Sequence, residues 1–358
     1  MVPYEQMILP LVPNRVFRTY LGGRVLDELH GKPDPKDSHY PEEWIASTTV
    51  AVNPNPIPNE GLSRGYLPDG STPYLKDLIN QAALSFLGAQ HIERFGAETD
   101  ILVKFIDSAV RLQVQAHPLP AFSRRYLNCN KGKTEAWIVL QVRNEPGMGY
   151  VYLGFQHPPA RKEWAAMIRE QDTEAIGSCF ERIYVQPGDV FIVQSAVPHA
   201  IGPGILMIEV QEPSDLVFRC EFACGGYQLP ESSRFMNLDL KTVLDAFDYS
   251  QVSREEVAHR WQPVPELIMN SAGGAVDRII GRDVTDKFVA YRITAQGPLN
   301  LENEQFSVCA VVEGRGLVGA SGATLTVRPG STFVIPTACE AWSVQPEQSP
   351  ITIIMARR

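Results

Sequence analysis

Two stretches of the chain, residues 100–222 and 288–356, consist of short runs of Val, Ile, Phe and Leu interrupted by Pro-Gly, Gly-Arg-Gly and similar turn sequences. Short apolar runs bounded by turn residues are typical of β-strands. Two such blocks predict two all-β units. Three other stretches, residues 74–95, 160–180 and 238–261, have apolar residues at helical spacing and are predicted to be helices attached to this β framework.

A weak internal repeat connects the two blocks. The segment 187–193, with the sequence PGDVFIV, is echoed 142 residues later by the segment 329–335, PGSTFVI. In both copies a Pro-Gly turn leads into an apolar strand, which favours two related barrels. His199 follows the first copy by 12 residues, and the same offset in the second copy reaches Ala341. The repeat therefore predicts one barrel that binds a metal and one that is purely structural.

Charge and composition exclude several classes of protein. The chain has 32 Lys and Arg against 41 Asp and Glu, a net charge of −9, so a nucleic-acid or anionic-membrane surface is not expected. No run of about 18 apolar residues occurs, and the N-terminus lacks a basic patch followed by an apolar run. We therefore expect a cytoplasmic protein. The six cysteines are scattered, and we expect them to be free thiols.

Ligand-type side chains occur at three places in the first block. Apolar and polar residues alternate along residues 112–118, so a strand there places Gln113, Gln115 and His117 on one face. Glu135 opens a later apolar run, and His199 follows the Pro-Gly strand. Two imidazoles and a carboxylate match a catalytic zinc site, although other divalent metals fit as well. The alternative is a strand whose polar face simply meets water.

Charged groups suited to proton transfer lie close to these candidates in the sequence. Lys133 is two residues before Glu135, and Glu209, Asp215 and Arg219 lie within 11 residues of one another. An arginine can hold a phosphate or a developing enediolate through two parallel hydrogen bonds. The alternative for each segment is a strand end with an ordinary ion pair.

Taken together, the motifs resemble those of the type I mannose-6-phosphate isomerases, zinc-dependent cupins, and in particular their short bacterial form. The resemblance runs from about residue 15 to the end and is strongest over residues 100–222. The segments that carry it, in order, are Glu42–Ser47, Leu102–Asp107, Gln115–Pro118, Gly132–Glu135, Pro187–Asp189, Pro198–Ala200 and Ser214–Asp215 with Arg219.

The resemblance implies a mainly β bicupin, in which two double-stranded β-helix jelly-roll barrels carry helical decorations. Residues 1–262 are expected to form the catalytic cupin domain with its cap, and residues 263–358 a second cupin without metal ligands. One Zn²⁺ per chain is expected. The implied ligands are Gln115, His117, Glu135 and His199. The implied catalytic residues are Lys133, Glu209, Asp215 and Arg219, and the implied substrate-binding residues are Gln113, Lys133 and Arg219.

The implied activity is the interconversion of mannose 6-phosphate and fructose 6-phosphate through a cis-enediolate, with a sugar phosphate as the partner molecule. The sequence departs from the family at Gln113, where Ser or Thr is common near the phosphate, at Leu119 and Pro120 after the His-Pro pair, and at Gly132. Two alternatives therefore stay open. One is an isomerase of another free or phosphorylated sugar, and the other is a non-catalytic sugar-binding bicupin. The sequence does not specify the proton carrier or the oligomeric state.

Overall fold

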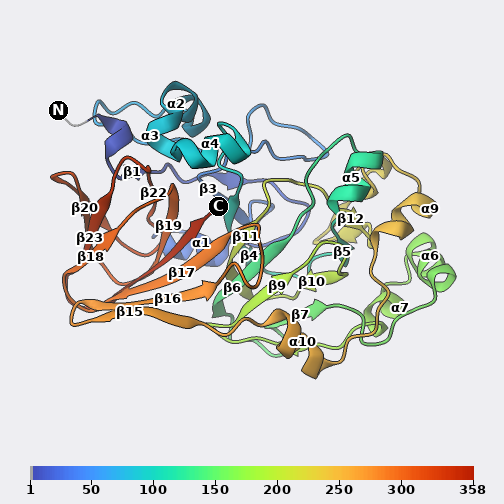
Figure 1. The fold of residues 1–358 in the computed structure, drawn as a ribbon. Coiled ribbons are helices and arrows are strands. Elements are labelled where there is room, and N and C mark those ends of the chain that lie inside the picture. The colour runs from blue at the N-terminus through green and yellow to red at the C-terminus, as the bar shows by residue number, and fades with distance from the viewer. Residues whose placement is uncertain (1–2) are drawn as a thin grey trace.

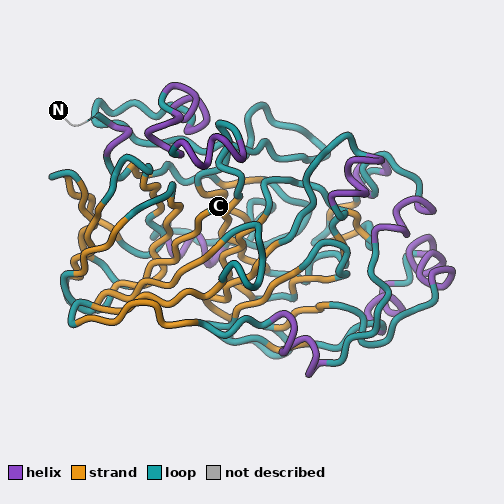
Figure 2. Tube along the Cα trace, in the orientation of Figure 1, coloured by secondary structure: helices purple, strands orange, loops and turns teal. Residues whose placement is uncertain are grey.

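The computed structural model describes residues 3–358 and is mainly β. Strands fill the middle and one end of the molecule, and most helices lie at the periphery (Figures 1 and 2). The strands form four larger sheets and one small hairpin sheet. The predicted predominance of β structure is therefore confirmed.

Two sheets are formed by strands between residues 15 and 219. In the six-stranded sheet the neighbours are, in order, β2 (Arg15–Val16), β3 (Glu42–Ile45), β4 (Leu102–Ser108), β11 (Ile205–Gln211), β6 (Glu135–Val142) and β9 (Val190–Val193). In the five-stranded sheet they are β12 (Phe218–Arg219), β5 (Gln115–Ala116), β10 (His199–Ile201), β7 (Tyr150–Leu153) and β8 (Ile183–Tyr184). A hairpin, β13 (Ala223–Cys224) and β14 (Tyr227–Gln228), stands apart.

Two further sheets come almost entirely from the last hundred residues. The seven-stranded sheet has the order β1 (Leu9–Pro10), β22 (Thr332–Ile335), β19 (Ser307–Glu313), β24 (Ile351–Arg357), β17 (Val289–Ala295), β16 (Gly274–Ile280) and β15 (Glu266–Ser271). The four-stranded sheet has the order β18 (Leu299–Glu302), β23 (Ala341–Pro346), β20 (Gly316–Ala320) and β21 (Ala323–Val327). The second β block thus begins at Glu266, earlier than the predicted residue 288.

The central strands are buried on both faces, which explains their continuous apolar runs. In β6, Trp137 and Val139 point into the core between the six- and five-stranded sheets. Ala136 and Ile138, on the other face, pack in a core that also contains Val308 of β19. Side chains alternate between the two faces of a strand, so one strand serves two cores. The six- and seven-stranded sheets consequently pack face to face.

The repeat is visible in the backbone. Gly188 and Gly330 have φ of 97° and 86°, a region that glycine adopts without strain. Their amides donate to the carbonyls of Val139 and Val311, each at 2.9 Å. Strands β10 and β23 begin at positions that are also 142 residues apart. The local structure of the two Pro-Gly segments is therefore the same.

Helices are more broken than the sequence predicted. Residues 74–95 form three helices, α2 (Leu75–Gln81), α3 (Ala83–Leu87) and α4 (Ala89–Phe95). Residues 160–180 form α6 (Arg161–Glu170) and α7 (Thr173–Ser178), and residues 238–261 form α9 (Leu240–Val243), a 3₁₀ turn (Leu244–Ala246) and α10 (Arg254–Trp261). The unpredicted helical elements are α1 (Arg24–Leu29), α5 (Pro120–Tyr126), α8 (Glu231–Arg234) and a 3₁₀ turn at Tyr4–Gln6.

The breaks in these helices have local causes. Ala82 leaves the helical region with φ of −138°, and Gly88 ends α3 with φ of 80°. Gln171 closes α6 in the left-handed region, and the side chain of Asp172 caps α7 by accepting from the amide of Ala175. Periodicity alone does not reveal such interruptions, because the apolar face continues across them.

The structure also bears on the cysteines, on the length of the helices and on the strand expected over residues 112–118. All six cysteines are free thiols, as predicted. Within residues 3–358, no helix is both long and apolar enough to cross a lipid bilayer. The strand expected over residues 112–118 is only two residues long, β5, because the flanking backbone bends around the site described below.

Candidate metal centre and active-site cavity

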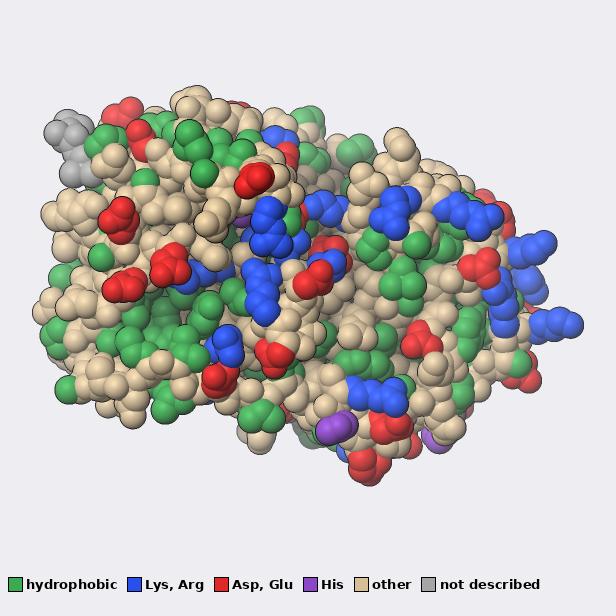
Figure 3. Space-filling view, in the orientation of Figure 1, with side chains coloured by type: hydrophobic (Ala, Val, Ile, Leu, Met, Phe, Trp, Pro, Cys, Tyr) green, Lys and Arg blue, Asp and Glu red, His purple; other side chains and the backbone are tan. Residues whose placement is uncertain are grey.

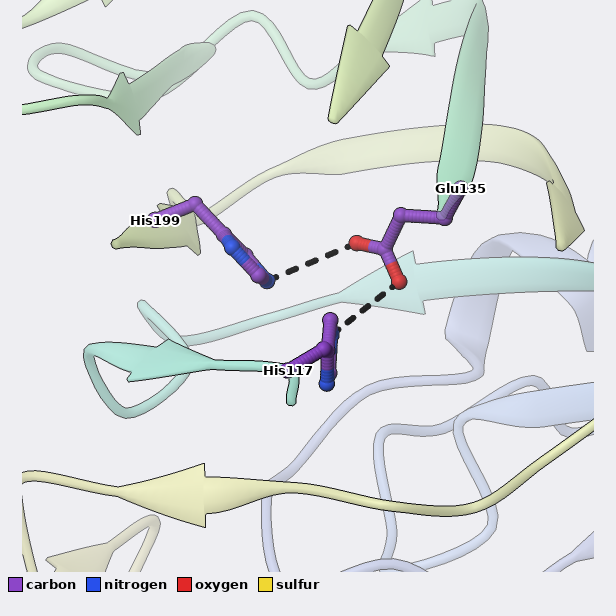
Figure 4. Close-up of side chains that lie close together, drawn as sticks. All are labelled: His117, Glu135 and His199. Carbon is purple, nitrogen blue, oxygen red and sulfur yellow. Dashed lines mark ion pairs between the residues drawn. The ribbon is translucent and has the colours of Figure 1, made fainter. Parts of the chain in front are cut away.

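The ends of three strands bring His117, Glu135 and His199 together. His117 follows β5, Glu135 is the first residue of β6, and His199 is the first residue of β10. Their ligand atoms all lie within 4.8 Å of one another, and each residue is at most 1% exposed. Figure 4 shows both imidazole rings turned toward the carboxylate, with His199 Nε2 3.4 Å from Glu135 Oε1 and His117 Nε2 3.2 Å from Oε2. The alternative of a polar strand face in water is therefore wrong for His117.

Backbone contacts fix the tautomer of both rings. His117 Nδ1 lies 2.7 Å from the carbonyl oxygen of Leu216, and His199 Nδ1 lies 2.8 Å from that of Val197. A carbonyl only accepts, so each Nδ1 carries the proton and each Nε2 presents a lone pair. Two lone pairs thus face the carboxylate of Glu135.

The electrostatics keep this group in the state that binds metals. Burial, and then the Lys133 ammonium, lower the pKa of His117 to about 3, and burial also lowers the pKa of His199. Burial opposes ionisation of Glu135, but Lys133 and the two histidines hold its pKa well below the usual range. Glu135 Oε2 lies 2.7 Å from Lys133 Nζ, yet it accepts no well-directed hydrogen bond. Neutral imidazoles and an ionised, under-satisfied carboxylate are good ligands.

Gln115 lies beside this group. Its side-chain amide is 3.3 Å from His199 Nε2, and β5 and β10 pair with Gln115 opposite His199. The amide nitrogen and oxygen of a glutamine are interchangeable in such an assignment. With the oxygen turned toward His199, Gln115 would offer a fourth ligand atom, which is the role that the resemblance implies.

A cavity opens above these residues. It is lined by seven of the nine residues singled out from the sequence, namely Gln113, Gln115, His117, Lys133, Glu209, Asp215 and Arg219. Glu135 and His199 lie beneath it, in contact with His117. The fold therefore brings all the predicted site residues to one place.

Lys104 and Glu42 also line the cavity, and the sequence analysis assigned no role to them. Lys104 Nζ lies 2.9 Å from Glu209 Oε2 and 3.8 Å from Glu42 Oε2. Glu42 in turn accepts from the hydroxyl of Tyr20 at 2.8 Å. Burial, together with the Glu135 carboxylate, raises the pKa of Glu209. A lysine inside the apolar run 101–106 was a usable signal, because a buried ammonium needs a carboxylate partner.

Arg18 also lines the cavity, and the residues around it in the sequence give no sign of a functional role. Its guanidinium donates to Glu42 at 2.9 Å and to both carboxylate oxygens of Asp215 at 3.2 and 3.3 Å. Asp215 also accepts from the amide of Val52 at 2.8 Å, and Asn53 accepts from Arg18. Asp215 therefore ties the loop around residues 50–60 to the cavity wall.

The positive charge of Arg219, unlike that of Arg18, is not balanced by a neighbouring carboxylate. Within the described part of the chain no carboxylate lies within 4 Å of Arg219, and its guanidinium donates to the carbonyl oxygen of Ser233 at 3.1 Å. Burial lowers the pKa of Arg219 to about 10, so it is still charged at neutral pH. Gln113 is 3% exposed and reaches Thr19 Oγ1 at 3.4 Å. Arg219 is therefore a cation that is available to an anionic ligand.

The chain is similar in sequence to mannose-6-phosphate isomerases over most of its length. The mannose-6-phosphate isomerase ManA of Bacillus subtilis (strain 168) is 24% identical over 258 residues, which is 71% of this chain and 75% of that protein. The mannose-6-phosphate isomerase of Streptococcus mutans is 23% identical over 288 residues, 77% of this chain and 81% of that protein. The chain is a homologue of the mannose-6-phosphate isomerases. The recognition made from the motifs is thereby confirmed.

Solved structures share the fold over almost the whole chain. The mannose 6-phosphate isomerase of Bacillus subtilis matches with a TM-score of 0.73 at 20% identity, covering 99% of this chain and 100% of that one. A mannosephosphate isomerase structure from Archaeoglobus fulgidus gives a TM-score of 0.74 at 19% identity, covering 98% and 97%. A zinc-bound mannose 6-phosphate isomerase gives 0.71 at 15% identity, covering 98% and 100%. A scan against protein-family models finds no match.

Proposed function

We propose that this chain is a zinc-dependent aldose–ketose isomerase that interconverts mannose 6-phosphate and fructose 6-phosphate through a cis-enediolate. The observation that carries the proposal is the buried His117–Glu135–His199 group beneath a cavity lined by lysine and arginine. The homologues named for this reaction support the substrate.

The residues fit a zinc ion. Two ligand atoms about 2.0–2.1 Å from a tetrahedral zinc lie roughly 3.3 Å apart, as calculated from the usual bond lengths. The distances from Glu135 to the two Nε2 atoms are 3.2 and 3.4 Å. Facing lone pairs repel each other unless a cation lies among them, and Lys133 approaches only His117 and Glu135. We assign His117, Glu135 and His199 as ligands, with the Gln115 amide oxygen as the fourth.

When bound, the zinc supplies positive charge that stabilises negative charge developing on the sugar oxygens. The remaining chemistry belongs to the side chains. The reaction requires removal of the proton on carbon 2 and its return to carbon 1, and the groups assigned to catalysis are Lys133, Glu209, Asp215 and Arg219. Glu209 fits the proton carrier best, because its pKa is raised toward the working pH. Asp215 fits a positioning role, because Arg18 holds it ionised.

Substrate binding is assigned to Arg219, Lys133 and Gln113. Arg18 and Lys104 are each paired with carboxylates, and Lys133 with Glu135, so Arg219 has the most charge to offer a phosphate. Gln113 contributes an amide where related proteins commonly have a hydroxyl. An isomerase of another free or phosphorylated sugar stays the alternative, because Gln113 alters this part of the cavity.

We further propose that residues 1–262 form a catalytic cupin domain and residues 263–358 a second cupin that binds no metal. The shared Pro-Gly turns and the equal offset of β10 and β23 support two jelly-roll barrels of common origin. Ala341, at the position matching His199, is exposed. A non-catalytic bicupin is less well supported, because a metal clamp alone does not require Lys133, Glu209 and Arg219 around one cavity.

A coupled assay that detects fructose 6-phosphate tests the proposal. Mannose 6-phosphate is expected to turn over in the zinc-loaded protein, with free mannose at least about 100-fold slower because it cannot use Arg219. Fructose formed from free mannose, and the ketose phosphate formed from allose 6-phosphate, are detected separately by chromatography. Turnover of free mannose or of allose 6-phosphate in preference to mannose 6-phosphate would overturn the assigned substrate.

A further inference from the structure

Four cationic side chains gather outside the cavity just described. Arg94 lies in α4, Lys131 precedes the Lys133 motif, Arg282 follows β16, and Arg358 follows β24. Figure 3 shows Lys and Arg side chains gathered in the middle of one face, near the position where Figure 1 places α4 and the C-terminus. We call this group the seam cluster, because it lies where the two β units and the helices α2–α4 meet. None of its members lines the catalytic cavity.

The arginines of the seam cluster share contact partners. Arg282 Nη1 and Arg358 Nη1 donate to the same carbonyl oxygen, that of Asp286, at 2.9 and 2.6 Å. The guanidinium groups of Arg94 and Arg358 lie 5.0 and 4.2 Å from the centre of the Phe95 ring. Burial lowers the pKa of Arg282, and the nearby charges of Arg358 and Arg94 add to the effect. Positive charges that share the same contact partners repel each other.

The carboxylates nearby do not neutralise the group. Asp100 pairs with both Lys131 and Arg358. Among the described residues, no carboxylate lies within 4 Å of Arg94 or Arg282, although Asp286 pairs with Lys287 and Glu304 lines the same hollow as Arg94 and Arg358. The side chains of the seam cluster therefore carry more positive charge than the side-chain carboxylates beside them neutralise, on a chain whose net charge is −9.

We propose that the seam cluster is a second anion-binding site, and that its ligand is a phosphate group on a small molecule. An anion there would remove the repulsion among the three guanidinium groups. Phosphate suits the arrangement because its oxygens accept hydrogen bonds from several directions at once, whereas a carboxylate engages a single guanidinium plane best. The hollow lined by Arg94 and Arg358 is open to solvent on the surface, so a small ligand has access.

The position of the cluster connects it with the catalytic unit. Asp100 precedes β4, which carries Lys104, and Lys131 is two residues from Lys133. An anion that draws Arg358 away from Asp100 would change the pairing of Asp100 and Lys131. Occupancy of the seam cluster is thus physically linked to strand β4, which carries Lys104, and to the loop before β6, which carries Lys133.

Calorimetric titration with inorganic phosphate at low ionic strength tests the proposal. The zinc-loaded Arg219→Ala variant is the background, because it lacks the anion anchor of the catalytic cavity. We expect one remaining phosphate site in this background, and at least about tenfold weaker binding when Arg94→Ala and Arg282→Ala are added. Both arginines are exposed, so the variants should fold. Arg260→Ala, an exposed arginine of α10 paired with Glu256, is the matched control and should leave binding unchanged.

Three results would overturn the proposal. One is the absence of phosphate binding in the Arg219→Ala background. Another is equal binding with and without the Arg94 and Arg282 substitutions. The third is tighter binding of succinate, a dicarboxylate of similar charge, which would exclude phosphate as the preferred ligand class. Melting temperatures of all variants verify that any lost binding does not reflect unfolding.

Discussion

In the proposed metal site His199 presents a single nitrogen, because its other ring nitrogen is held by the carbonyl of Val197. Replacing it with alanine removes one of three strong ligands, so we expect His199→Ala to lose most of its zinc. Elemental analysis of protein purified without chelators should give about one zinc per chain in the parent, in line with a single catalytic site. The exposed His157 provides the control, since His157→Ala should retain zinc. Full metal content in His199→Ala would remove it from the ligand set.

Among residues 3–358, Arg219 is the cavity cation without a carboxylate partner, so its loss should affect turnover rather than folding. We expect Arg219→Ala to bind zinc, to melt near the parent temperature and to turn over at least about 100-fold more slowly. Steady-state kinetics and thermal melts measure both effects. Parent-like turnover would exclude Arg219 from catalysis.

Arg219→Lys should make KM depend on pH, with KM rising as the pH rises. Burial lowers the pKa of Arg219 to about 10, and the same environment disfavours the charged form of a lysine. The lysine variant should therefore lose its charge, and with it phosphate binding, as pH rises through a range in which arginine is still protonated. KM measured from pH 6 to 9 should rise on the alkaline side in Arg219→Lys but not in the parent. Parallel KM profiles would contradict this explanation.

Asp215 is a poor base, although burial disfavours its charge, because Arg18 and Lys104 hold its pKa below the usual range. Asp215→Asn weakens the hydrogen bonds that residue 215 accepts from Arg18 and from the amide of Val52. We therefore expect KM to rise by a larger factor than kcat falls. The pH profile of kcat should stay as in the parent. Breaking a buried ion pair typically costs about 3–5 kcal/mol, so a lower melting temperature is also expected. A kcat profile that loses an ionisation would instead make Asp215 the proton carrier.

At the scale of elements, the two Pro-Gly turns allow the same Gly→Ala substitution to be compared at equivalent positions. Gly188 has open space where a Cβ would lie, whereas a Cβ at Gly330 would meet Leu29 at 3.1 Å and His30 at 3.3 Å, both at the end of α1. A non-glycine residue in the left-handed region costs roughly 1–2 kcal/mol. We therefore expect Gly188→Ala to be destabilised by about this amount and Gly330→Ala by more.

Chemical denaturation of each variant measures the free energy of unfolding. Gly177 lies in the helix α7 and has no positive φ, and a Cβ added there would lie 3.9 Å from its nearest neighbour, the Tyr152 hydroxyl oxygen. Gly177→Ala should therefore be more stable than the parent by about 0.5–1 kcal/mol. Equal stability of Gly188→Ala and the parent would show that the first turn is not constrained as the repeat implies.

At the scale of the whole molecule, the two β units share a core. Ile138 and Ile208 of the six-stranded sheet pack in one cluster with Val308 and Ile354 of the seven-stranded sheet. Separating the units would expose this apolar face to water, which opposes their independent unfolding. We expect a single calorimetric transition for the full chain. Two resolved transitions would mean that each unit is stable by itself.

Much of the fold follows from local patterns in the sequence. Runs such as residues 135–142 predict strands because side chains alternate over two residues, and the Pro-Gly turns of both units follow from glycine's freedom at positive φ. The metal-ligand candidates were also recognisable, because histidine and carboxylate next to strand ends form a small set. Helix breaks at Ala82 and Gln171 were not predictable from periodicity, since the apolar stripe continues past them.

Only the tertiary structure decided what each charge does. Arg18 and Asp215 are 197 residues apart in the sequence, yet their pairing fixes Asp215 in place, while Arg219 is left without a carboxylate. Lys104 looks like an interruption in an apolar strand until β11 places Glu209 beside it. The physical reason is that strand formation depends on neighbours along the chain, whereas the charge state and partner of a buried group depend on side chains brought close by sheet pairing. The sequence therefore determined the β units and the candidate ligands, and the tertiary structure determined which cations are neutralised and which are free to bind an anion.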